Sequence, residues 1–279
     1  MNICSSDMDC IIFLDNLMKI GFFYKFLGLV GGTVISFMFS NNSFAEENNE
    51  VMADDAVKVC AIPQLYDYLE DLKKVYSLGK IDISYASSSM IYASVINNQM
   101  KCDIFLGNDQ KFPARYITSG VGDSTGYGNF TKTTLALFSV TSIIDKDCDV
   151  LNKDIYNKII MPNPKYNVSG FAASQIIELY IKKNPKIKNK VIYSDNEYSA
   201  LSSIVNGYAM LGFLPYNMVV DNKMTKNGSF CLFSDTEYEP INYYYMTFKN
   251  SKNIKATNSF RDYLFSDKSR LILKKHGYK

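Results

Sequence analysis

Hydroxyl and amide side chains stand at three places where a predicted strand gives way to a predicted helix. Gln64 follows the run VKVCAI, Ser88 lies in an SSS triplet after a strand, and Ser169 stands near the end of the loop NPKYNVSG. Unpaired backbone N–H groups and the positive end of the helix dipole make a helix start an anion site that needs no lysine. One such serine is more often a structural N-cap, but recurrence at three strand ends favours binding of a small anion.

Residue counts exclude several common kinds of active site. His276 is the single histidine, which rules out a Ser-His-Asp triad or a multi-histidine metal site in the rest of the chain. No GxGxxG, P-loop, GxSxG or HExxH motif occurs. The acidic pairs 54–55 and 70–71 are interpreted as solvated charges. We therefore predict no enzyme activity, no cofactor and no metal cation bound by protein ligands.

The size and charge of the chain point to an ordinary globular protein. Its 279 residues suffice for one large or two ordinary domains. With 30 basic and 28 acidic residues, the net charge of +2 gives no electrostatic case for a nucleic-acid partner.

The first 45 residues have the pattern of an export signal. Lys19 and Lys25 precede an uncharged stretch over 26–39, which is shorter than the roughly 20 apolar residues of a membrane-spanning helix. Small residues lead up to Ala45, so we expect cleavage after it, a disordered mature end over 46–55 and a periplasmic location. A retained membrane anchor is the alternative. Translation could start at Met1 or Met18, with Met18 favoured because residues 1–17 are acidic.

Four cysteines remain after that cleavage. Cys60 and Cys102 lie inside apolar, strand-like runs, where we expect buried thiols. Cys148 and Cys231 could form a disulfide in an oxidising compartment, but the sequence leaves the pairing open.

Strand-like and helical runs alternate from Val57 onward, as in α/β proteins with mostly parallel sheets. A strand at 57–62, a helix over 65–76, a strand starting at 81 and a strand at 102–107 form a first set. A Gly-rich stretch, 120–128, separates it from a second set. The expected later strands are 134–140, 158–162, 190–194, 209–215, 229–233 and 242–248, and the later helices lie near 173–181, 198–205 and 270–276. This order predicts two α/β lobes.

The run ISYASSSMIYASVINNQMKCDIFLGNDQKF, residues 83–112, resembles periplasmic molybdate-binding proteins, the solute receptors of molybdate ABC importers. In that family a strand, an ASSS-type turn, a helix and a D-(I/L/V)-F-x-x-x-D-x-K-(W/F) segment follow in this order. Weaker likeness extends over the segments VKVCAIPQLYDYLEDL, NPKYNVSGFAASQIIELY, AMLGFLPYNMV and ILKKHGYK. The resemblance implies a two-lobed type II periplasmic binding protein with a two-segment hinge. Lobe I would comprise 56–135 plus 242–279, and lobe II 136–241.

The resemblance also implies five ligand-binding residues. Ser88 matches a ligand-binding serine of the family, and Tyr216 fits its ligand-binding tyrosine after a one-residue insertion. Gln64 stands where the family usually has serine, Ser169 where it has alanine, and Tyr198 near a small apolar position. Gln64 adds an acceptor, which would allow a protonated oxyanion such as phosphate.

The implied function is a non-enzymatic receptor that captures molybdate or tungstate in the periplasm. It would act as a monomer and deliver this oxyanion to an ABC importer permease in the inner membrane. Two alternatives stay open: a receptor of the same fold for another small anion or an organic solute, and a secreted interaction protein that has lost its transport role.

Overall fold

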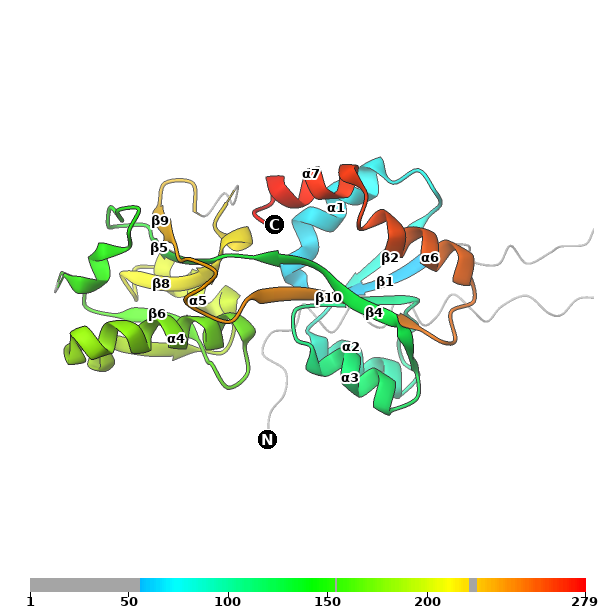
Figure 1. Cartoon of the computed structure of the whole chain (residues 1–279), viewed down its shortest axis with the longest axis horizontal. Coiled ribbons are helices and arrows are strands. Elements are labelled where there is room, and N and C mark those ends of the chain that lie inside the picture. The colour runs from blue at the N-terminus through cyan, green and yellow to red at the C-terminus, as the bar shows by residue number, and fades with distance from the viewer. Residues whose placement is uncertain (1–55, 154, 221–224) are drawn as a thin grey trace, which may run out of the picture. The chain divides into compact units, whose positions relative to one another are not determined.

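Two five-stranded sheets flanked by helices form the described part of the chain (Figure 1). The computed structural model describes residues 56–153, 155–220 and 225–279. The predicted export signal, 1–45, and the predicted mature end, 46–55, lie outside these residues. Within the described ranges, no helix has the length and apolar character needed to cross a membrane.

The first sheet has the strand order β2-β1-β3-β10-β4. Its strands are β1 (Val57–Ala61), β2 (Ile81–Tyr85), β3 (Ile104–Gly107), β4 (Gly122–Thr133) and β10 (Ile241–Phe248). β1 pairs in parallel with β2 and β3, whereas β10 runs antiparallel to β3 and β4. The sheet is therefore mixed, with its parallel part at the N-terminal strands.

The second sheet has the order β7-β6-β8-β5-β9. Its strands are β5 (Leu135–Ser139), β6 (Ile159–Pro162), β7 (Val191–Ser194), β8 (Leu211–Pro215) and β9 (Ser229–Leu232). β6 is parallel to β7 and β8, and β5 is antiparallel to β8 and β9. The chain enters this sheet at Leu135 and leaves it after Leu232. The exact lobe boundaries stay a prediction.

Helices follow most of the parallel strands. They are α1 (Tyr66–Val75), α2 (Ser88–Ile96), α3 (Lys111–Thr118), α4 (Val168–Lys183), α5 (Glu197–Val205), α6 (Ile254–Tyr263) and α7 (Asp267–Lys275), with short 3-10 helices η1 (Pro63–Leu65), η2 (Asp149–Asn152), η3 (Pro185–Lys190) and η4 (Tyr216–Met218). The helix predicted over 65–76 is present as η1 and α1, and Tyr68, Leu69 and Leu72 form its buried apolar face. Gly277 follows the end of α7 with a φ of +79°, the left-handed conformation that glycine commonly adopts just after a helix.

β4 differs from the sequence-based expectation, which treated 120–128 as a break between two sets of elements. The glycines there permit close packing against β10 instead. A Cβ on Gly126 would lie 1.8 Å from Thr247 Oγ1, and one on Gly128 would lie 3.1 Å from the Tyr245 ring. Glycine is thus the residue that lets β4 approach its partner strand.

The expectation of free thiols at Cys60 and Cys102 is wrong, because these residues form a disulfide. Cys60 lies in β1 and Cys102 just before the neighbouring parallel strand β3, with their Cα atoms 5.8 Å apart. Apolar surroundings fit a buried thiol and a buried disulfide equally well, so composition could not separate them. Cys148 and Cys231 form a second disulfide, with Cα atoms 5.5 Å apart.

Asp71 joins α1 to α7, which lie side by side (Figure 1). Its carboxylate contacts Lys74 at 2.7 Å, Lys275 at 2.8 Å and His276 Nε2 at 2.9 Å. Hydrogen bonds from Lys275, Lys74 and His276 hold the pKa of Asp71 well below its usual range. Asp71 is thus a part-exposed charge that is held in ion pairs.

Candidate ligand-binding site

A pocket of about 340 Å³ lies where strands of both sheets end and helices begin. It is lined by Pro63, Gln64, Tyr66, Asp67, Tyr85, Tyr198, Asn217 and Met218. The first five of these follow or end β1 and β2, and the last three follow β7 and β8. Ligands of open α/β sheets bind at the carboxyl ends of the strands, so this pocket is the candidate site.

A buried carboxylate stands beside this pocket. Glu197, the first residue of α5, is 2% exposed. Its Oε1 accepts a hydrogen bond from Ser169 Oγ at 2.6 Å, and its Oε2 accepts one from Gln64 Nε2 at 3.1 Å. The helix N-terminus and these two donors stabilise the negative charge. A carboxylate of the chain itself therefore occupies two donors that the sequence assigned to a bound anion.

Hydrogen bonds hold the main chain of Gln64, whereas its side-chain oxygen has no partner. Its main-chain oxygen accepts hydrogen bonds from Tyr278 Oη at 2.7 Å and Asn217 Nδ2 at 3.3 Å. Its side-chain Oε1 is buried and has no hydrogen-bond partner among the described residues. Reversing the amide would place this oxygen against the Glu197 carboxylate, so the side chain keeps its NH₂ toward Glu197 and its acceptor unpaired.

Asn217 connects the second sheet to the C-terminal end of the chain. Its Nδ2 donates to Tyr278 Oη at 3.0 Å, and its Oδ1 accepts from Tyr243 Oη at 3.4 Å. Burial raises the pKa of both Tyr243 and Tyr278, so both stay neutral phenols that hydrogen bond. This network fixes one wall of the pocket.

Three tyrosines add aromatic surface to the pocket. The ring centroids of Tyr66 and Tyr85 are 5.0 Å apart, and Tyr85 Oη donates to Glu70 Oε1 at 3.0 Å. Burial, and then the charges of Glu197 and Asp67, raise the pKa of Tyr198 to about 12. The described lining contains no Lys, Arg or His, so the charges at the pocket are negative.

Only some of the five predicted ligand-binding residues lie at the pocket. Gln64 and Tyr198 line the pocket, and Ser169 reaches it through Glu197. Ser88, the first residue of α2, and Tyr216, whose ring centroid is 5.3 Å from that of Phe230, do not line it. The roles of all five stay predictions.

Sequence reasoning missed Glu197, Asp67 and Asn217. Each of these three residues adjoins or lies close to a residue that the sequence did indicate, because the loops at the strand ends were identified correctly. An acidic residue directly after Asn196, the N-cap of α5, was the available signal for Glu197.

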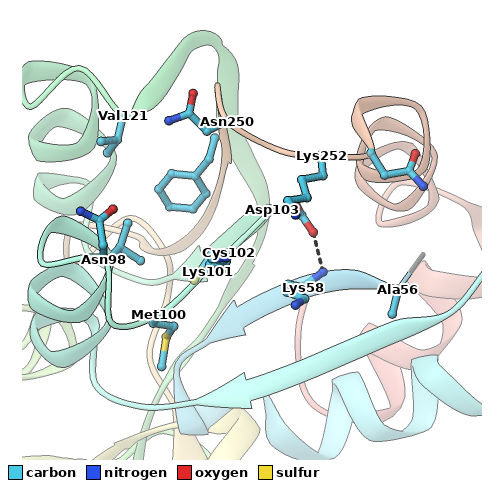
Figure 2. A pocket seen from close by; sticks show the side chains of 13 residues that line it. Ala56, Lys58, Asn98, Met100, Lys101, Cys102, Asp103, Val121, Asn250 and Lys252 are labelled. Atoms are coloured by element: carbon cyan, nitrogen blue, oxygen red, sulfur yellow. Dashed lines mark hydrogen bonds between the residues drawn. The ribbon is translucent and has the colours of Figure 1, made fainter. Parts of the chain in front are cut away.

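A second pocket, of about 370 Å³, lies at the opposite ends of the first sheet's parallel strands (Figure 2). Figure 2 shows Asp103 beside Lys58, whose backbone N–H donates to Asp103 Oδ2 at 2.8 Å. Ala56 precedes β1 and Lys101 precedes β3, so this pocket faces the amino ends of the strands. That position makes it the weaker candidate for a solute.

Two mixed sheets and a pocket at their strand ends define a two-lobed solute-binding fold. The sequence profile described as bacterial extracellular solute-binding protein matches residues 57–279, and the chain belongs to this family. No match was found among curated protein sequences.

Solved structures share the fold at low sequence identity. The periplasmic molybdate-binding protein of Azotobacter vinelandii is 22% identical with a TM-score of 0.68, over 80% of this chain and 98% of that one. The substrate-binding domain of a putative molybdenum ABC transporter from Clostridium difficile is 24% identical with a TM-score of 0.65, over 80% and 98%. L-phospholactate-bound PEB3, a Campylobacter jejuni protein, is 17% identical with a TM-score of 0.64, over 80% and 99%.

Proposed function

We propose that this chain is the periplasmic solute receptor of an ABC importer and binds its solute in the pocket lined by Gln64 and Tyr198. The pocket supports this role because both sheets contribute to it: Tyr66 and Tyr85 from one side, Asn217 from the other. A solute bound there would contact both lobes, and the resulting hinge closure is what a permease recognises. The predicted export signal fits this location, and cleavage after Ala45 would give a mature protein that begins at Glu46.

The identity of the solute depends on Glu197. Resemblance and two of the structural neighbours favour molybdate or tungstate. A dianion, however, would be repelled by the buried carboxylate, which already uses the donors of Ser169 and Gln64. An oxyanion would have to displace this carboxylate from its donors. The geometry therefore favours the alternative of an organic solute.

The pocket is tested by solute retention. The full chain, exported in a bacterial host and desalted from rich medium, should carry one small molecule per protein in native mass spectrometry. Replacing Tyr198→Ala and Asn217→Ala together should reduce retention at least tenfold, because both side chains line the pocket. Tyr193→Ala is the matched control, since this tyrosine is 59% exposed on β7 and does not line it. Equal retention by the double variant, or no retained solute at all, contradicts the proposal.

The oxyanion alternative has a separate test. If molybdate is the solute, it should raise the midpoint of thermal unfolding, since a ligand at 100 times its Kd stabilises by about 2.7 kcal/mol. Ser88→Ala with Tyr216→Phe should then weaken molybdate binding at least tenfold in calorimetry. Unchanged molybdate binding would exclude Ser88 and Tyr216 as ligand-binding residues.

A further inference from the structure

The charges at the pocket suit a cation. Asp67 lines the pocket in the first turn of α1, and Glu197 lies directly behind Gln64. The described lining residues include no Lys, Arg or His that could neutralise these two carboxylates. A positively charged group entering the pocket is attracted by both, whereas an oxyanion is repelled by both.

Two acceptors at the pocket have no donor among the described residues. Gln64 Oε1 is buried without a partner, and Asp67 has no hydrogen bond or ion pair among the described residues. The Glu197 carboxylate has about four lone-pair sites, and two donors bind it here. A buried acceptor without a donor is unfavourable, and a ligand N–H group would satisfy it. These unpaired acceptors favour a ligand that donates hydrogen bonds, which a fully ionised oxyanion cannot do.

The aromatic rings complete this arrangement. Tyr66, Tyr85 and Tyr198 line the same pocket, and the faces of tyrosine rings attract cations. The same rings, together with Met218, provide apolar surface for the carbon skeleton of an organic molecule. A volume of about 340 Å³ limits that molecule to a small one.

We infer that the solute is a small organic amine, with its protonated nitrogen near Asp67 and Gln64 Oε1 and its carbon skeleton against the tyrosine rings. Glu197 contributes its charge from behind Gln64. This inference rests on the proposed function, because it names the chemical class of the solute that the same pocket would bind. An amine with N–H groups is favoured over a quaternary ammonium ion, which cannot donate to Gln64.

Calorimetry on the full chain tests the inference with defined probes: putrescine, ethanolamine and tyramine as amines, choline as a quaternary ion, and sodium molybdate and phosphate as oxyanions. At least one amine should bind at one per chain, more tightly than choline, and neither oxyanion should bind. Asp67→Asn should weaken amine binding at least threefold and Glu197→Gln at least tenfold. Asp82→Asn, an exposed change of equal charge on β2 outside the pocket, should leave binding unchanged.

Several results would overturn the inference. Binding of molybdate or phosphate without any amine would refute it while leaving the solute receptor role intact. Amine binding that is equal in Asp67→Asn, Asp82→Asn and the unaltered chain would refute it as well, and Asp67 is exposed, so this variant does not depend on burying a new group. Failure of all six probes also counts against an amine, and solute retention then decides the receptor role independently.

Discussion

At the scale of single residues, the site is organised around one buried carboxylate. Removing a carboxylate from water is unfavourable unless donors or a helix N-terminus compensate it. Glu197 receives both kinds of compensation, from Ser169 and Gln64 and from the start of α5. The side chains that the sequence marked as binding groups therefore also stabilise the protein when no solute is bound.

Ser169→Ala should lower the free energy of unfolding by about 1 to 3 kcal/mol, because it removes a donor from a buried charged group. Ser169 is 1% exposed, and its hydroxyl lies 2.6 Å from the Glu197 carboxylate. Urea unfolding measures the change. Ser174→Ala, at a part-exposed position of the same helix, should cost less than about 0.5 kcal/mol. Equal destabilisation by the two substitutions would show that the Ser169 hydroxyl has no special role.

Part of this site could be predicted from sequence. Gln64, Ser169 and Tyr198 follow strands, and strand ends are recognisable from local patterns. The bond between Gln64 and Glu197 spans 133 residues of sequence, and no local pattern reveals such a pairing. Ser88 and Tyr216 were chosen by resemblance, which carries a family's residue roles but not the geometry of this pocket.

At the scale of elements, the contact between α1 and α7 depends on charge as well as packing. Tyr68 Oη bonds to Ser269 Oγ at 2.8 Å, and Asp71 contacts Lys275 and the His276 ring at the end of α7. Lysines at the C-terminus of a helix also favour its dipole. The first and last helices of the described chain are thereby held together by a network rather than by one exposed pair.

Asp71→Asn should destabilise the protein by about 1 kcal/mol near pH 6, since it removes the centre of this network. The folded protein depresses the pKa of Asp71, so its contribution is fully present above the ordinary aspartate value of about 4. The difference from the unaltered chain should therefore shrink as the pH falls below about 4. Denaturant unfolding over a pH series measures it, with Asp82→Asn as the exposed control. A difference that stays constant down to pH 2 would exclude the carboxylate as its source.

The elements themselves were largely predictable. Alternating apolar residues identified β5 to β10, and helical spacing identified α1 and α4. The 12-residue strand β4 was missed because glycines at 122, 126 and 128 are typical of turns in isolation. Glycine is needed at 126 and 128 because side chains of β10 pack closely against these positions. β10 lies more than 100 residues later in the sequence, so only the tertiary structure explains these glycines.

At the scale of the whole described chain, each sheet has its own covalent bridge. The Cys60–Cys102 disulfide spans 42 residues beside the first sheet, and Cys148–Cys231 spans 83 residues beside the second. Cross-links over long loops restrict the unfolded chain strongly. Disulfides of this kind form in oxidising compartments, which agrees with the predicted export.

Loss of either disulfide should lower the free energy of unfolding by about 2 to 4 kcal/mol. The paired substitutions Cys60→Ala with Cys102→Ala, and Cys148→Ala with Cys231→Ala, test the bridges one at a time by urea unfolding. Peptide mapping of the unaltered chain without reduction should recover both cross-linked pairs. An unchanged unfolding midpoint in a reducing buffer would contradict a stabilising role for both.

Tyr278 links the two sides of the pocket. Its backbone bridges Thr133 in β4, and its hydroxyl contacts Gln64 and Asn217, which belong to opposite sides of the pocket. Tyr278 and Gln64 both belong to the predicted lobe I and Asn217 to lobe II, so a separation of the lobes would break the bond between Asn217 and Tyr278. Shortening the Tyr278 side chain should therefore raise the rate at which the solute dissociates and shorten the lifetime of the complex.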